Sequence, residues 1–343
     1  MSANILFVCG SLNQTTMMHQ IARQLGEHSC FFTPFYAQGF LGGLSRLGLL
    51  DFSILGGRHR RNTLRYLAQQ GLPVDFGGQG RDYDLVVTCT DLIVQPNLRG
   101  KWMVLVQEGM IAPEGLGYAL ARYLKFPRYL ADTAATGLSD AYDVFCVASP
   151  GFRDLFVRKG IKPEKLLVTG VPNFDHLDAY RKNDFPYHHF VLATTSSMRE
   201  TFKWDDRAGF IAKARRIAAG RQLIFKLHPN EDALRARREI EQLAPEAMVL
   251  EDGNVHQMIA NCDVLVSQLS SVVFTGLALG KEVHTDGDLE AMRRLLPIQN
   301  GGASAGRIAE VCRRLLGGQW PESAATGGTL NARLGKQTPP IAG

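Results

Sequence analysis

Short apolar runs, each followed by a segment of helical periodicity, place the strongest constraint on how this chain folds. The first run, Asn4 to Cys9, ends at a glycine and precedes residues 16–25, whose apolar positions recur at helical spacing. Similar apolar runs occur at residues 85–89, 102–106 and 142–148, and helical segments recur along the chain. Strands that alternate with helices pair in parallel, so the sequence predicts a doubly wound α/β fold.

A polar, proline-containing segment, residues 176–188, separates two such series and is predicted to be an interdomain linker. The chain has 343 residues, 45% of them hydrophobic, which is enough for two domains. We therefore predict an N-terminal domain over residues 1–175 and a C-terminal domain over residues 189–316. The Gly-, Ala-, Pro- and Thr-rich tail, residues 317–343, is predicted either to be mobile or to pack back on the body. Residues 39–57 lack a clean period and are assigned to no element.

Composition favours a cytoplasmic protein that handles small anionic ligands. The formal charge of +5 arises from 38 basic and 33 acidic residues spread along the chain, which is too weak an excess to predict nucleic-acid binding. Six cysteines lie far apart without a Cys-x-x-Cys pair, as expected of reduced core residues. No apolar stretch approaches the ~20 residues that span a bilayer, and the N-terminus lacks a signal-peptide pattern. Peripheral contact with the inner face of a membrane remains compatible with these features.

The stretch Lys226-Leu-His-Pro229 lies where a buried strand ends. Pro229 cannot continue a strand ladder, so the chain must turn after His228 and leave Lys226, His228 and Glu231 at or beyond the carboxyl end. Ligands of α/β sheets bind at this end, because loop amides and helix N-termini converge there. Taken alone, the stretch is equally typical of a polar strand exit with one solvated histidine.

A second stretch, Ser267-Gln-Leu-Ser-Ser271, follows a strand and opens a helix. Its hydroxyls and backbone amides would lie at the positive end of that helix, where a phosphate is held without a metal. Ser270 and Ser271 taken alone are equally explained as helix N-caps. Together with the His-Pro strand exit and the loop that carries Thr195 and Ser196, the stretch predicts a nucleotide-binding edge.

An acidic residue follows the predicted strand at residues 102–106. The strand exits into Gln107-Glu108-Gly109, which places a carboxylate on a loop at the carboxyl edge of the first sheet. Gly109 permits a backbone turn that a side chain would hinder. Glu108 is therefore the first candidate for a general base, and Glu114 is the second. Capping of the following helix is the alternative role of Glu108.

Three stretches resemble a known family, the metal-independent GT-B glycosyltransferases of bacterial surface-polysaccharide synthesis. They are Lys226 to Pro229, residues 261–274 with Leu279-Gly-Lys-Glu-Val283, and Gly170-Val-Pro-Asn-Phe-Asp175. Within this family, the sequence resembles the branch that includes CDP-glycerol glycerophosphotransferases, bacterial sialyltransferases and Kdo transferases. The resemblance is strongest over residues 165–285, whereas the first domain matches only in layout.

The resemblance implies two Rossmann-like domains facing a cleft and an inverting transferase that uses a nucleotide-activated donor and a saccharide or lipid-linked acceptor. It implies that Glu108 is the general base, that His228 stabilises the leaving phosphate, and that no cofactor or metal is required. The residues implied to bind the nucleotide are Lys226, His228, Pro229, Gln268, Ser270, Ser271, Thr195 and Ser196. Arg199 is either a further phosphate neighbour or a solvated surface charge.

Two positions depart from the pattern of the family. Many relatives read Asp-Tyr-Ser-Ser where this chain has Gln268-Leu-Ser-Ser271, and they carry an acid for the ribose where it has Thr275. These departures leave the identity of the donor open, together with a non-catalytic nucleotide-binding descendant of the fold. UDP-N-acetylglucosamine 2-epimerases share the two-domain layout and are the alternative enzyme class.

Overall fold

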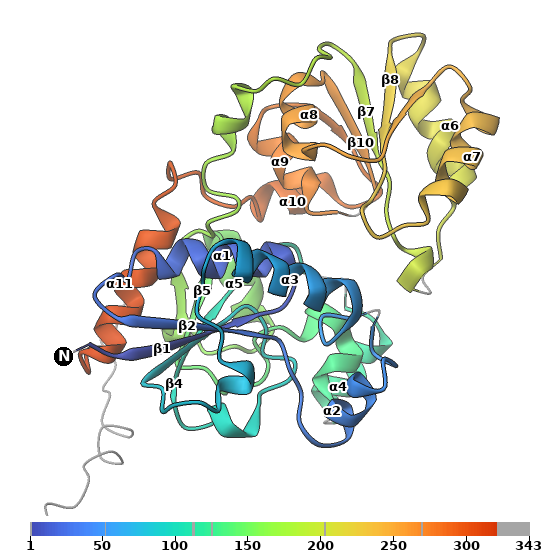
Figure 1. Ribbon diagram of the computed structural model, residues 1–343. Coiled ribbons are helices and arrows are strands. Elements are labelled where there is room, and N and C mark those ends of the chain that lie inside the picture. The colour runs from blue at the N-terminus through green and yellow to red at the C-terminus, as the bar shows by residue number, and fades with distance from the viewer. Residues whose placement is uncertain are drawn as a thin grey trace, which may run out of the picture.

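The computed structural model describes residues 2–51, 53–111, 114–124, 126–201, 204–268 and 270–320, arranged as two α/β domains stacked one above the other (Figure 1). The lower domain contains a sheet of six parallel strands in the order β2-β1-β3-β4-β5-β6. Its strands are β1 (Asn4–Cys9), β2 (Ser29–Pro34), β3 (Leu85–Thr88), β4 (Trp102–Val106), β5 (Val144–Val147) and β6 (Leu166–Val168). The α-helices between these strands are α1 (Leu12–Ala22), α2 (Gly39–Arg46), α3 (Gly57–Gln69), α4 (Leu116–Tyr123) and α5 (Pro150–Arg158).

The upper domain contains a sheet of five parallel strands in the order β11-β10-β7-β8-β9. Its strands are β7 (Val191–Thr194), β8 (Leu223–Lys226), β9 (Met248–Leu250), β10 (Val264–Ser267) and β11 (Glu282–His284). Its α-helices are α6 (Arg207–Ala218), α7 (Ala233–Leu243), α8 (Val255–Asn261), α9 (Val272–Ala278) and α10 (Leu289–Arg294). The predicted two-domain parallel α/β architecture is therefore confirmed.

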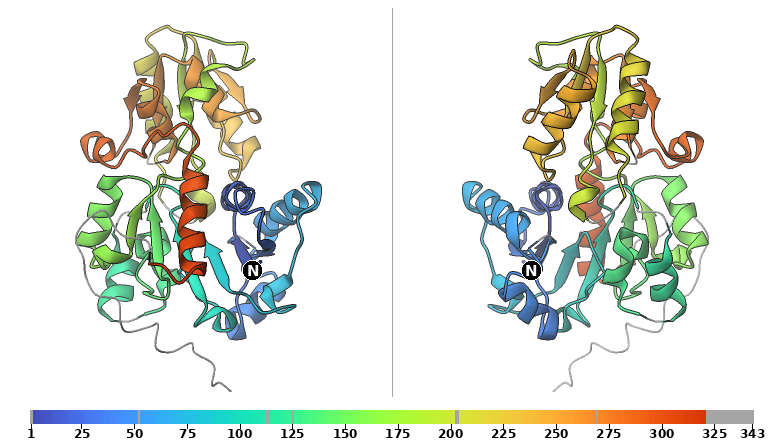
Figure 2. Two further views of the ribbon diagram at one scale, coloured as in Figure 1. Left: turned by 90° about the vertical axis from the view of Figure 1, so that its left-hand side faces the viewer. Right: turned by 90° about the vertical axis from the view of Figure 1, so that its right-hand side faces the viewer.

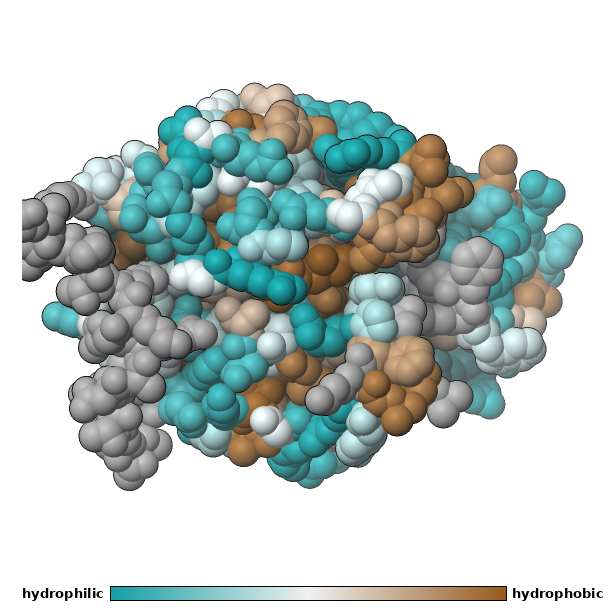
Figure 3. All heavy atoms as spheres, turned by 90° about the horizontal axis from the view of Figure 1, so that it is seen from below, coloured by the Kyte–Doolittle hydropathy of each residue, from teal (hydrophilic) through white to brown (hydrophobic). Residues whose placement is uncertain are grey.

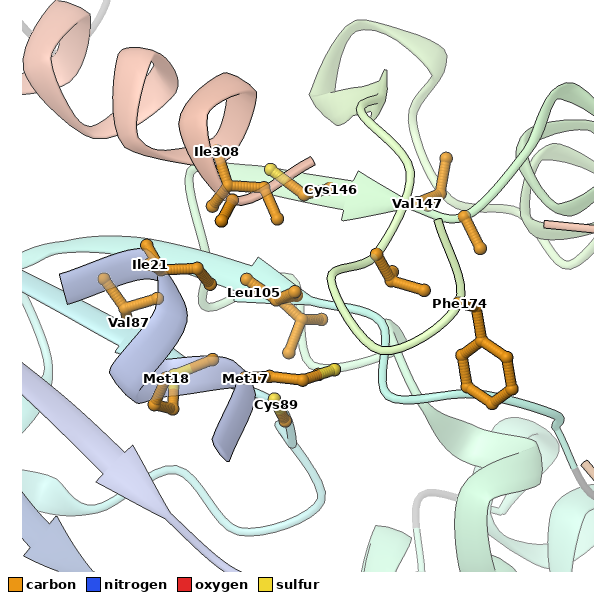
Figure 4. Close-up of a cluster of buried hydrophobic side chains, with 14 of the residues drawn as sticks. Met17, Met18, Ile21, Val87, Cys89, Leu105, Cys146, Val147, Phe174 and Ile308 are labelled. Atoms are coloured by element: carbon orange, nitrogen blue, oxygen red, sulfur yellow. The ribbon is translucent and has the colours of Figure 1, made fainter. Parts of the chain in front are cut away.

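The central strands are buried along their whole length and mostly apolar, because helices cover both faces of each sheet. Every residue of β3, β5, β7 and β10 is buried. In the lower domain, Met17 and Ile21 of α1 pack against Leu105 of β4 (Figure 4). All six cysteines are reduced, and five of them are buried.

The last helix, α11 (Ser304–Leu316), packs on the lower domain, although its sequence position groups it with the second domain. It contacts α1 and β4, and its Ile308 lies near Cys146 in the core (Figures 2 and 4). Arg313 pairs with Glu27 at 2.6 Å, which fixes the outer end of the helix. The chain thus crosses between the domains twice. Of the predicted tail, only residues 317–320 lie within the described part of the chain.

The linker contains a short helix that its polar composition did not predict. The 3₁₀ helix η5 (Leu177–Arg181) lies against α8, where the ring of Tyr180 stacks on His256 with 4.9 Å between the ring centres. The return crossing runs beside α5, where the amide of Ile298 donates to the carbonyl of Ala148 at 3.0 Å. Both crossings therefore pack against a domain rather than crossing through solvent.

None of the helices in the described residues has the length and apolar character needed to cross a lipid bilayer. The unassigned region, residues 39–57, contains helix α2, and helix α3 begins at its end. The sequence of helix α3 shows no helical pattern of apolar residues, because only two of its residues, Thr63 and Leu67, are buried. Its first turn is rich in arginine and lies next to the upper domain.

Candidate active site

Two contacts bring the carboxyl edges of the sheets together between the domains. Gly109, just beyond β4, lies so close to Ser271, just beyond β10, that a methyl group on Gly109 would be 4.0 Å from Ser271 Cβ. Arg58, in the first turn of α3, donates a hydrogen bond from Nη1 to the carbonyl of Pro229, just beyond β8. Loops from both domains therefore line one shared space.

The order of strands in the upper sheet creates a crevice at this edge. The chain runs from β7 outward to β8 and β9 on one side, and then to β10 and β11 on the other. The loops that leave β7 and β10 consequently diverge, and ligands of open α/β sheets bind at such a point. The structure brings together here a set of predicted polar residues, namely Thr195, Ser196, Gln268, Ser270 and Ser271.

Gln268 connects the two diverging loops. Its Oε1 accepts the hydroxyl of Ser196 at 2.5 Å, and its Nε2 donates to the Asp205 carboxylate at 2.8 Å. One strand residue earlier, the hydroxyls of Thr194 and Ser267 lie 2.7 Å apart. The side chain of Gln268 thus links the two loops as a neutral amide that both donates and accepts.

Glu231, which was only noted near the strand exit in the sequence, anchors this edge. Its side chain is 1% exposed, and one oxygen accepts the hydroxyl of Thr195 and the backbone amide of His228, the latter at 2.7 Å. The other oxygen pairs with Arg207 at 3.0 Å. Burial raises the pKa of Glu231, whereas the Thr195 hydroxyl and the Arg207 guanidinium oppose that rise. The buried carboxylate therefore sets the backbone of the His228 loop.

The ring of His228 is held in one orientation. Its Nδ1 accepts the backbone amide of Asn230 at 3.1 Å, so the neutral ring carries its proton on Nε2. Burial lowers the pKa of His228, and the charge of Lys226 lowers it further. The ring is therefore neutral near pH 7 and presents Nε2–H as a hydrogen-bond donor.

Lys226 and Arg199, both considered as phosphate neighbours, are engaged elsewhere in this structure. The Lys226 ammonium donates to the carbonyls of Leu227 and Glu251 at 2.8 and 2.9 Å, beside β9 rather than at the crevice. Burial lowers the pKa of Lys226. Arg199 makes a bidentate ion pair with Glu239 at 2.7 and 2.8 Å. Both cations thus tie loops together.

Ser271 begins helix α9 without capping it through its side chain. The alternative explanation of Ser271 as a side-chain N-cap is therefore not what the structure shows. Further along α9, the buried Thr275 accepts or donates a hydrogen bond with Nδ1 of His256 at 3.0 Å. Thr275 is thus joined to α8 and, through His256, to Tyr180 of the linker.

Glu108 projects toward β1 and α1 of its own domain. One oxygen accepts the Ser11 hydroxyl at 2.9 Å and the Asn13 amide at 3.5 Å, and the other accepts Nε2 of Gln14 at 2.5 Å. The carboxylate is therefore fixed in place beside the first turn of α1. The second candidate base, Glu114, is half exposed and pairs with Lys159 at 3.5 Å.

His59 is a further titratable group of this space that sequence reasoning did not single out. It lies next to Arg58 in the first turn of α3, whose contact with Pro229 bridges the domains. Burial lowers the pKa of His59, while the nearby charge of Glu108 opposes that shift. A histidine within an Arg-His-Arg-Arg run gives no sequence signal that distinguishes it from a solvated basic surface.

Among the residues that the structure describes, no group of three or more His, Cys, Asp or Glu side chains is arranged to hold a metal ion. The absence of a metal requirement stays a prediction.

Two parallel α/β domains whose strand ends face each other define the GT-B class of fold. No family model and no curated protein matches the sequence. Among solved structures, UDP-GlcNAc 2-epimerase from Neisseria meningitidis bound to UDP-GlcNAc is similar, with a TM-score of 0.57, 12% identity and coverage of 91% of this chain and 100% of that one. The S. aureus MnaA–UDP complex is similar as well, with a TM-score of 0.58, 12% identity and coverage of 95% of this chain and 100% of that one.

The wall teichoic acid polymerase TagF is also similar, with a TM-score of 0.52, 10% identity and coverage of 92% of this chain and 89% of that one. At such identities the likeness extends to the fold and no further. Both kinds of neighbour share the two-domain architecture, so the fold alone does not separate a transferase from an epimerase.

Proposed function

We propose that this protein is an inverting, metal-independent transferase that moves a sugar or a glycerophosphate from a nucleotide-activated donor to a hydroxyl acceptor. The donor binds at the crevice between β7 and β10, and the acceptor binds on the lower domain. The observation that carries the proposal is the strand-order reversal between β7 and β10, where the side chains of Ser196 and Gln268 are hydrogen-bonded across the two diverging loops. Similar structures contain UDP-GlcNAc, UDP and CDPG, which supports a nucleotide-linked ligand.

The chemistry of the crevice suits a departing nucleotide phosphate. Transfer breaks the bond between the donor carbon or phosphorus and the phosphate oxygen, and negative charge develops on that oxygen. The neutral His228 ring supplies an Nε2–H donor, and Ser270 and Ser271 add hydroxyls. Preorganised donors of this kind are usually a large part of transition-state stabilisation.

Two alternatives differ from this proposal in a measurable product. An epimerase releases a rearranged sugar and a nucleoside diphosphate without needing an acceptor. A non-catalytic descendant binds the nucleotide but consumes no donor. The Gln268 and Thr275 departures affect donor identity in all three cases.

A binding screen followed by a turnover assay tests the proposal. Thermal shift with CMP, CDP, UDP and GDP first identifies the nucleotide, because the base of the nucleotide limits the donor class. Donors carrying that nucleotide are then incubated with and without candidate acceptors, and the products are separated by mass spectrometry. Acceptor-dependent release of the nucleotide supports a transferase. Free rearranged sugar without an acceptor supports the epimerase, and binding without donor consumption contradicts any transferase.

Chelation separates the proposed mechanism from a metal-dependent one. Turnover is expected to survive EDTA, because the His228 donor and the serine hydroxyls can offset the charge of the leaving phosphate. Loss of turnover on chelation, restored by Mn²⁺ or Mg²⁺, would contradict metal independence while leaving the transferase assignment intact.

Exposed apolar side chains on the lower domain favour a lipid-linked acceptor at an anionic membrane surface. Phe40 of α2 is 80% exposed, Leu47 just beyond α2 is 75% exposed, and Tyr123 at the end of α4 is 72% exposed. Arg46 and Arg122 lie beside them in sequence. Seen from below, apolar side chains gather toward the side where α2 and α4 lie (Figures 1 and 3). Aromatic and aliphatic groups flanked by arginine are typical of surfaces that rest on anionic headgroups.

Co-sedimentation with vesicles tests this surface. The protein is expected to bind vesicles that contain phosphatidylglycerol and not those of phosphatidylcholine alone. A Phe40→Ser, Leu47→Ser double variant is expected to lose most of this binding. Trp204→Ser is the matched control, because Trp204 is 85% exposed but lies in the upper domain. Equal vesicle binding by both variants would contradict the assignment.

A further inference from the structure

The first turn of α3 lies between the two halves of the candidate site. Thr63, one turn beyond His59, donates its hydroxyl to the carbonyl of Gly10 at 2.9 Å and lies 3.1 Å from the Thr15 hydroxyl. Helical residues four apart share one face, so His59 lies on the side of α3 that is turned to the end of β1. Ser11, the residue after Gly10, donates a hydrogen bond to Glu108.

The same turn reaches the upper domain. Arg58 donates to the carbonyl of Pro229, and Pro229 directly follows His228. His59 is therefore flanked by the Glu108 carboxylate on its own domain and by the His228 loop across the space. The mutual influence of the charges agrees with this placement, because Glu108 acts to raise the pKa of His59 and His59 acts to lower the pKa of His228.

Glu108 is arranged to hold its position rather than to move a proton. Its oxygens already accept from Ser11, Asn13 and Gln14. A carboxylate fixed in this way provides a negative charge at a constant place, and that charge stabilises a positive charge that develops on a neighbouring group.

His59 has the complementary properties. The structure shows no hydrogen bond of its ring to any described residue, and the side chain is half-buried between the domains. Burial lowers its pKa below the ordinary histidine value, so the ring is neutral near pH 7 and able to accept a proton.

We propose that His59 is the group that takes the proton from the acceptor hydroxyl, and that the negative charge of the nearby Glu108 stabilises the protonated ring. This assignment rests on the proposed transferase function. The acceptor O–H proton passes to the free nitrogen of His59, and the oxygen forms a bond to the donor carbon or phosphorus. The bond from that atom to the nucleotide phosphate breaks, and its electron pair stays on the phosphate oxygen beside His228. Glu108 offsets the charge of the imidazolium until the proton leaves to solvent.

His59→Gln tests the assignment directly. The change is expected to lower kcat by about 10²–10⁴-fold, the range of general-base catalysis, and to leave nucleotide affinity in the thermal-shift assay unchanged. Arg61→Gln is the matched control on the same helix, since Arg61 is exposed, and its turnover is expected to equal that of the wild type.

The pH dependence of kcat separates a proton acceptor from a structural residue. In the wild type, kcat is expected to rise with pH to a plateau, with a limb set by the His59 pKa. Glu108→Gln removes the charge that raises that pKa, so the limb is expected to shift to lower pH and the plateau to fall. His59→Gln is expected to show no such limb.

The outcomes distinguish this assignment from the function on which it rests. If the wild type turns over the donor and His59→Gln is fully active, the assignment of His59 is overturned. The proposed transferase function is not affected by that result. If Glu108→Gln does not move this limb of the pH profile, the electrostatic role of Glu108 is overturned. Nucleotide binding without turnover in the wild type overturns the proposed function, and the assignment of His59 falls with it.

Discussion

The carboxylate of Glu231 accepts the backbone amide of His228 at 2.7 Å on one oxygen and pairs with Arg207 at 3.0 Å on the other. A buried side chain thus fixes the one backbone turn that aims the His228 ring. The ring itself adds a second restraint by accepting the amide of Asn230. The geometry of the proposed leaving-group site therefore depends on residues that do not face the ligand.

Glu231→Gln is expected to lower both stability and nucleotide affinity. The neutral amide keeps the shape but removes the charge that pairs with Arg207, and a buried polar group left without its partner costs about 1–3 kcal/mol. Urea unfolding measures the first effect and nucleotide titration the second. Glu241→Gln on the exposed face of α7 is the control and is expected to change neither. Normal nucleotide affinity in Glu231→Gln would show that the His228 loop is held by other contacts.

His228→Ala and Ser270→Ala are each expected to weaken nucleotide binding without unfolding the protein. Both residues lie beyond strand ends and are partly exposed, so neither substitution removes core packing. Each change is expected to cost roughly 0.5–1.5 kcal/mol of binding, the net value of one hydrogen bond. Titration of the nucleotide identified by the thermal-shift screen gives the affinities. Unchanged affinity in both variants would move the donor site elsewhere.

The sequence predicted the architecture because most strands are short runs rich in apolar residues. The predicted bounds of β1 and β4 agree with the structure to the residue. Helix α3 was not predicted, since an arginine-rich helix with two buried residues has no apolar period to detect. The placement of α11 on the lower domain also left no sequence signal, because its apolar face would suit either sheet.

The candidate site was predicted less completely than the fold. Polar residues at strand ends, such as Ser196 and Gln268, can be located from the apolar run before them. The partnership of Glu231 with Arg207 cannot be predicted, because Glu231 lies beyond β8 whereas Arg207 begins α6, and only the folded domain brings them together. His59 belongs to a helix that was not predicted, so its approach to Glu108 required the structure.

Acidification is expected to destabilise the protein through His256. Burial between the linker and α9 lowers the pKa of His256 below its ordinary value of 6.5. Between the folded and unfolded pKa values the unfolded chain binds more protons, so the free energy of unfolding decreases as the pH falls through 6.5. One pKa unit corresponds to about 1.4 kcal/mol.

Urea unfolding between pH 7.5 and 5 measures this effect. The free energy of unfolding of His256→Gln is expected to decrease less over this interval than that of the wild type. His189→Gln is the control, because the His189 side chain is 85% exposed. His19, His59 and His228 also have lowered pKa values, so some dependence is expected to remain. Parallel curves for the wild type and His256→Gln would contradict the role of His256.

The return crossing between the domains depends on the absence of a side chain at Gly151. A methyl group there would lie 1.9 Å from the carbonyl oxygen of Arg294 at the end of α10, and this neighbour is backbone that cannot rotate away. Gly151→Ala is therefore expected to push α10 from α5 and to cost about 1–3 kcal/mol of stability, although alanine is the better helix former by about 1 kcal/mol.

Gly26→Ala is the control, because a methyl group there meets nothing within 4 Å, and it is expected to change stability by less than about 0.5 kcal/mol. Urea unfolding measures the cost, and small-angle X-ray scattering reports whether the domains separate. A Gly151→Ala protein with wild-type stability and an unchanged radius of gyration would show that the return crossing accommodates the methyl group without loss of stability.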